Sequence, residues 1–228
     1  MQVINATDGI RITKTSTTAG LLSRVLWITT VGFLFTAFGA YISPEFMSGL
    51  GFGAVVVVTF ILLFAIRFAA KRSPALGLAM FYVFTIAMGV EVGPLVKSYL
   101  HLANGQAIVF NAALTTAAGM AVMALVAHIV NFNYQKVGNY AIAALFGLII
   151  VGFLGMFFHF VSPTVYSYFG LIIFSVLLLV DFMRLRDSPA NSTPVFLALS
   201  IYLDALNIFL FLLQIFGNGG NRRDSKWS

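Results

Sequence analysis

Seven apolar runs of at least 20 residues fill most of this chain of 228 residues. They cover residues 21–42, 50–70, 75–100, 107–130, 140–161, 165–184 and 194–216. A helix needs about 20 apolar residues to cross a hydrocarbon layer of about 30 Å. Only 9% of the residues are charged, against roughly 25% in soluble domains. The sequence therefore predicts an all-α polytopic membrane protein with seven transmembrane helices.

Short polar links separate these runs, so we expect consecutive helices to be mostly antiparallel neighbours in one domain. We predict a polar N-terminal tail at residues 1–20, a bundle at 21–217 and a basic C-terminal tail at 218–228. With the N-terminus in the cytoplasm, nine basic residues lie at inner helix ends and four at outer ends. This asymmetry favours that orientation.

The charge and composition also limit the function classes. The net charge of +6 marks cytoplasmic helix ends in a membrane protein, so no nucleic-acid partner is expected. The absence of cysteine excludes disulfides and thiolate metal sites, and no cofactor is expected. A bacterial inner membrane is the favoured location, with the endoplasmic reticulum membrane as the alternative for a eukaryotic chain.

Asp204 lies near the middle of the last apolar run, where a carboxylate facing lipid would be costly. Ser200, Asp204, Asn207 and Gln214 fall on one face of that helix together with Phe211. The rest of the helix is apolar on all sides, which is typical of a helix at the centre of a bundle. The stripe either meets a water-lined path or serves as polar glue between helices.

Asp181 is a second intramembrane acid, near the inner end of the sixth run. We expect a depth difference of about 6–9 Å from Asp204, at 1.5 Å per residue, so a modest stagger lets the carboxyl groups meet. Two carboxyls in one apolar site cannot easily both ionise, so the pair would hold a proton and act as a pH sensor. Arg67 is expected at a similar depth, where it either pairs with Asp181 or extends to the interface.

Glu91 is the third acid within an apolar run, in the outer part of the third predicted helix. With Asp204 and Asp181 it suggests a sparse acidic ladder across the membrane, and Glu91, Ser200, Asn207 and Gln214 are candidates for lining a path. Carboxylate and carbonyl oxygens suit a hard cation such as calcium, bound transiently.

The segments "FSVLLLVDFMRLRD" and "LALSIYLDALNIFLFLLQIFG" resemble the last two helices of the Bax-inhibitor-motif family. The resemblance implies a seven-helix fold in which the other six helices surround the last one. It also implies a pH-sensitive calcium leak controlled by two aspartates, which match Asp181 and Asp204, with the family's helix-two arginine matching Arg67. Two features depart from the family pattern: Gln214 stands where many relatives have arginine, and the second run has no acid.

Two other function classes compete with the leak. The resemblance also suggests a regulatory protein that binds a membrane protease or a cell-death partner, so another membrane protein is a candidate partner beside lipid and calcium. Two intramembrane aspartates are also the machinery of aspartyl proteases. In those enzymes the second aspartate follows a Gly-x-Gly motif, whereas Asp204 follows Ile201, Tyr202 and Leu203, so no enzymatic activity is expected.

Overall fold

Seven helices make up the computed structural model, which describes residues 6–158, 161–189 and 192–224. The helices are α1 (Ala6–Ile42), α2 (Gly49–Arg72), α3 (Pro74–Leu100), α4 (Gly105–Ile129), α5 (Tyr134–Phe158), α6 (Pro163–Asp187) and α7 (Pro194–Asp224). Each contains a segment long and apolar enough to span a membrane, and the described residues form no strand. The predicted fold class is confirmed.

The helix boundaries follow local sequence signals. Ser48 caps α2 by accepting a hydrogen bond from the Gly51 amide, as serine commonly does at a helix start. Proline occupies the first turn of α3 and of α6, where its missing N–H costs nothing. Asn104, which precedes α4, has a φ of 61°, a left-handed conformation that asparagine tolerates better than most residues.

Three predicted boundaries differ from the structure by more than three residues. Helix α7 continues to Asp224, eight residues beyond the predicted end at residue 216, so part of the expected C-terminal tail is helical. The first helix starts at Ala6, so part of the expected polar tail is helical, although the membrane-length segment begins at Gly20. Helix α5 begins at Tyr134, six residues before the predicted start at residue 140. The polar residues there form its first turn, because the Asn133 side chain accepts a hydrogen bond from the Lys136 amide. Residues 1–5, 159–160 and 225–228 of the predicted tails and fifth span lie outside the described residues.

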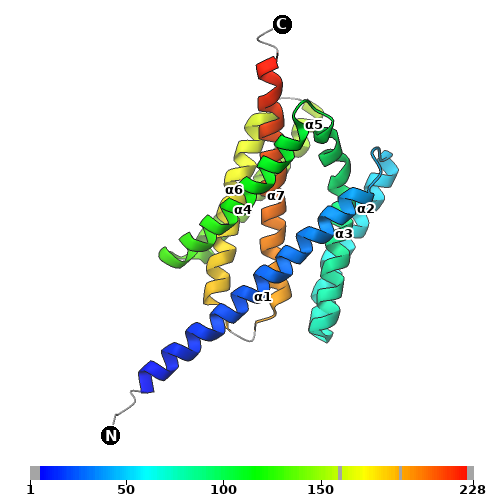
Figure 1. Cartoon of the computed structure of the whole chain (residues 1–228). Coiled ribbons are helices and arrows are strands. Elements are labelled where there is room, and N and C mark those ends of the chain that lie inside the picture. Colours follow the sequence, from blue (N-terminus) through cyan, green and yellow to red (C-terminus); the bar gives the residue numbers. More distant parts are fainter. Residues whose placement is uncertain (1–5, 159–160, 190–191, 225–228) are drawn as a thin grey trace.

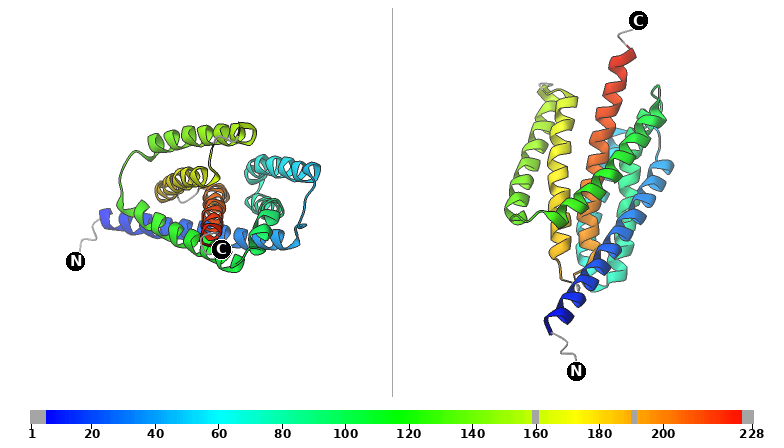
Figure 2. Two further views of the ribbon diagram at one scale, coloured as in Figure 1. Left: turned by 90° about the horizontal axis from the view of Figure 1, so that it is seen from above. Right: turned by 60° about the vertical axis from the view of Figure 1, so that its left-hand side comes forward.

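Helix α7 lies at the centre of the bundle. It packs against α1, α3, α4 and α6, whereas α2 packs mainly on α3 and α5 on α6. Figure 2 shows α7 nearly end-on between α6 and α3, with α1 and α4 along one side. In the most apolar part of α7, 67% of the residues are buried, a larger share than in any other membrane-length segment. The central position is as expected, but four helices rather than six form its main contacts.

The chain starts and ends its helical part at opposite ends of the bundle, with α7 running as one continuous helix (Figure 1). Such an arrangement fits an odd number of crossings. Many large apolar side chains point outward, among them Phe60, Phe64 and Phe68 on α2 and Phe153 and Phe157 on α5. Exposed apolar surface of this extent marks a contact with lipid or protein rather than with water.

Glycines bring α1 and α3 into close contact. A Cβ on Gly89 would collide with the backbone of α1 at Thr36, and a Cβ on Gly39 with the backbone of α3 at Ile86. Small residues allow this approach in membranes, where van der Waals contact drives much of helix association. The Tyr202 hydroxyl then ties α7 to α1 through a hydrogen bond of 2.6 Å with the Thr36 hydroxyl.

Candidate functional site

Asp181 and Asp204 meet between α6 and α7. Asp181 lies six residues before the end of α6 and Asp204 ten residues after the start of α7, which at 1.5 Å per residue is a depth difference of about 6 Å. Their relative exposures are 6% and 8%, and the carboxyl groups lie close enough to hydrogen bond. The structure therefore brings together the two acids that the sequence singles out, while their role as a sensor stays a prediction.

The Asp181–Asp204 pair has few hydrogen-bond donors around it. The Ser200 hydroxyl lies near the Asp181 carboxyl. Within the described residues, Oδ2 of Asp204 is fully buried and has no N–H or hydroxyl donor. Ionised carboxylates only accept hydrogen bonds, so one carboxyl can bond to the other only when one of them is protonated. The arrangement is chemically suited to hold one proton between two acids.

Arg184, rather than Arg67, is the charged partner of Asp181. Nη1 of Arg184 lies 3.0 Å from Oδ1 of Asp181, three residues earlier on the same helix. Arg67 is exposed on α2, and α2 packs mainly on α3 rather than α6. The predicted pairing of Arg67 with Asp181 is therefore not formed. Its side chain is free to extend toward the interface, the alternative that the sequence left open.

The rest of the predicted stripe on α7 makes protein contacts. Gln214 accepts a hydrogen bond of 2.8 Å from Ser167 on α6. Asn207 donates to the Leu203 carbonyl of its own helix at 2.8 Å. Ser200, Asp204 and Gln214 thus all make their contacts with α6, which is the behaviour expected of polar glue between membrane helices.

Glu91 does not join the aspartate pair. It is half-buried on α3 and lies near Thr59 on α2, whose hydroxyl donates to the Val55 carbonyl. Among the described residues, no three acids or histidines gather closely enough to hold a metal ion. The acids occupy separate helix interfaces, so the expected ladder is not assembled as one site in this conformation.

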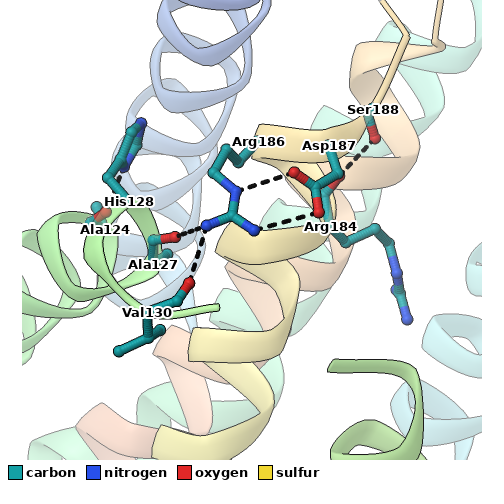
Figure 3. Close-up of polar contacts among 8 residues, drawn as sticks. All are labelled: Ala124, Ala127, His128, Val130, Arg184, Arg186, Asp187 and Ser188. Carbon is teal, nitrogen blue, oxygen red and sulfur yellow. Dashed lines mark hydrogen bonds and ion pairs between the residues drawn. The ribbon is translucent and has the colours of Figure 1, made fainter. Parts of the chain in front are cut away.

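Arg186 is a functional-site neighbour that the sequence did not single out. Its Nη1 donates hydrogen bonds to the Ala127 and Val130 carbonyls at the end of α4, at 2.5 and 3.0 Å, while its Nε lies 2.9 Å from Asp187 (Figure 3). Arg184 extends in a different direction in the same view. The last carbonyls of a helix lack partners within the helix, so a cation beside them is favourable. Arg186 therefore links the end of α4 to α6, the helix that carries Asp181.

The signals for both arginines were present in the sequence. A spacing of three residues places Arg184 on the same helix face as Asp181. Basic residues in the last turn of a helix are a common sign of carbonyl capping. What the sequence lacked was the packing of α4 beside the end of α6, which decides which carbonyls Arg186 reaches.

Comparison with known proteins identifies the family of this chain. The family described as "Inhibitor of apoptosis-promoting Bax1" matches residues 18–221, which include all seven membrane-length segments. The chain belongs to this family.

Several bacterial proteins are similar to this Bax inhibitor family member. An uncharacterized protein of Borreliella burgdorferi is 27% identical over 88% of this chain and 92% of its own length. The uncharacterized protein YrjE of Lactococcus lactis is 27% identical over 74% of this chain and 73% of its own. An uncharacterized membrane protein of Streptococcus pyogenes is 26% identical over 73% of each chain. These similarities support a shared membrane fold.

Proposed function

We propose that this Bax inhibitor family protein is a calcium leak whose opening depends on the protonation of the Asp181–Asp204 pair. The observation that carries the proposal is the close approach of two buried carboxyls on α6 and α7. Removing the shared proton changes the interaction between these helices from a hydrogen bond to a repulsion between like charges. A buried site makes that change large, because the charges are poorly screened.

The contacts around the pair support a closed state. The carboxyl of Asp181 is held by Arg184, and Gln214 is held by Ser167. Neither of the two cavities described for the bundle is lined by Asp181 or Asp204. Loss of the shared proton would separate α6 from α7 and hydrate the stripe of Ser200, Asn207 and Gln214. Glu91 would then contribute an oxygen ligand only after a rearrangement of the outer half.

We place the protein in a bacterial inner membrane with the N-terminus in the cytoplasm. The inner ends of the helices then carry most of the basic residues, including Arg67, Lys71 and Arg72 at the end of α2 and Arg184 and Arg186 at the end of α6. This distribution follows the positive-inside rule. The chemistry proposed is ion passage, not covalent catalysis.

The test is calcium flux into liposomes that contain the purified protein alone, measured from about pH 6 to pH 8. Asp204→Asn keeps the size of the side chain and removes its titration. We expect it to insert at the wild-type level and to lose most of the pH dependence of the leak. Glu45→Gln is the control, because Glu45 is an exposed acid in the link between α1 and α2.

Two results would contradict the proposal. A wild-type pH profile in Asp204→Asn would remove Asp204 from the gate. Absence of calcium flux in the wild-type protein would favour the regulatory alternative, in which the bundle binds a membrane protease or another membrane partner. Asp204→Leu tests for a structural role of Asp204. It removes the polar partner of Asp181, so it should lower the thermal stability if the pair holds α6 and α7 together.

A further inference from the structure

A cavity on the opposite side of α7 from the aspartate pair is not used by the proposed leak. Its volume is about 580 Å³, and α1, α3, α4 and α7 supply its walls. Its α7 lining consists of Leu206 and Phe209, whereas Asp204 is absent from its wall. Ala113 and Ala117 of α4 line it and are also exposed, so the cavity opens sideways toward the space occupied by the bilayer.

The cavity has the depth of one leaflet. On α4 its lining runs from Val109 to Met120, a separation of eleven positions or about 16 Å along the helix. Half of the hydrocarbon layer is about 15 Å. Its outer end lies at Tyr41 and Lys97, which are close to the ends of α1 and α3 and therefore to the level of the lipid head groups.

The cavity walls contain few groups that could hydrogen bond to a polar ligand. Only four lining residues carry polar side-chain atoms: Thr36, Tyr41, Lys97 and Thr116. The Thr36 hydroxyl is already bonded to Tyr202 and Gly32, and the Thr116 hydroxyl donates to the Ala112 carbonyl. A cavity whose polar groups are satisfied tends to stay dry and to take an apolar guest. A hydrated ion is therefore a poor occupant.

Lys97 supplies the one charge at the opening. Its ammonium donates to the Tyr41 and Ser43 carbonyls at the end of α1. An ammonium has three N–H donors, so one donor remains beyond these two bonds. Within the described residues no carboxylate lies within ion-pair distance of it. A positive charge at the head-group level attracts an anionic head group.

We propose that this cavity binds one acyl chain of an anionic membrane phospholipid, with its phosphate-bearing head group at Lys97. The cavity is apolar and about as deep as one leaflet, which suits an acyl chain. The remaining N–H donor of Lys97 favours a negatively charged head group. The lipid would pack directly on Leu206 and Phe209 of the central helix. This site is separate from the Asp181–Asp204 pair and does not depend on calcium conduction.

The test measures phospholipid retained by the full-length protein after purification in detergent, by native mass spectrometry with added phosphatidylglycerol or phosphatidylcholine. Ala117→Phe fills the cavity, and Ala118→Phe is the matched control, because Ala118 is an exposed neighbour that does not line it. Excluding even two methylenes of the chain corresponds to roughly tenfold weaker binding. We therefore expect at least that loss in Ala117→Phe and wild-type retention in Ala118→Phe.

A second variant tests the head group. Lys97→Gln should reduce the preference for phosphatidylglycerol over phosphatidylcholine while the chain still binds. Melting temperatures of all variants show whether they are folded. The proposal is overturned if folded Ala117→Phe retains as much phospholipid as wild type, or if wild type shows no preference for the anionic lipid. Displacement by oleate with exclusion of phospholipid would also overturn it, since the occupant would then be a free fatty acid.

Discussion

Arg184 donates a hydrogen bond to Asp181 across 3.0 Å on one face of α6, and the same carboxyl meets Asp204 of α7. The guanidinium is half exposed and the carboxyl almost fully buried. A charge near the C-terminal end of α6 therefore acts on an acid pair that water barely reaches.

Replacing each arginine in turn should separate their roles. Arg184→Gln removes the charge beside Asp181 and should shift the pH profile of the calcium leak. Its effect on stability should be small, about 0–1 kcal/mol, because one partner is exposed. Arg67→Gln should leave both properties near wild type, since the Arg67 side chain is exposed on α2. An unchanged profile in Arg184→Gln with a shifted profile in Arg67→Gln would reverse this assignment.

The shared proton should be visible by infrared spectroscopy. We expect wild-type protein near neutral pH to show the C=O band of a protonated carboxyl, because two carboxyls in contact need a proton between them. Asp204→Asn and Asp181→Asn should each remove the band of the pair. Glu45→Gln should leave it in place. Persistence of the same band in both aspartate variants would assign the proton to another acid, with Glu91 the next to examine.

Arg186→Gln should loosen α4. The variant loses the donor to the Ala127 and Val130 carbonyls and the ion pair with Asp187. Hydrogen bonds from a charged donor contribute about 1.5–3 kcal/mol each, and partial replacement by lipid head groups or water reduces the net cost to about 2 kcal/mol. Thermal unfolding in detergent measures it. Arg72→Gln, at an exposed position in the last turn of α2, is the control and should change the melting temperature little.

Gly89→Ala should destabilise the α1–α3 interface. The added Cβ would lie 2.9 Å from the Ala40 amide nitrogen and closer still to the Thr36 carbonyl. Forcing a methyl group into such a contact costs about 1–3 kcal/mol. Gly119→Ala is the matched change on α4, where a Cβ meets nothing within 4 Å. Equal melting temperatures for the two variants would show that the helices separate easily at Gly89.

The seven helices were predictable because each is long enough to show its apolar character without any tertiary information. The central place of α7 was also predictable, since its apolar surface continues around the helix. The sequence likewise placed Asp181 and Asp204 on consecutive helices at similar depth. It did not show that α2 packs on α3, which takes Arg67 away from Asp181. Nor could it show the cavity, because Ala113 and Ala117 read as ordinary helix residues until α1, α3 and α7 are seen to supply the other walls.

The position of α7 has a consequence for biogenesis. The ribosome delivers this helix after the six that precede it in the chain, so those six enter the membrane before the helix that α1, α3, α4 and α6 pack against. Until α7 arrives, Asp181 has neither Ser200 nor Asp204 beside it and faces an unfinished interface. Assembly of this protein should therefore be completed by its seventh helix in one late step, and a chain stopped before Pro194 should be a substrate for membrane quality control.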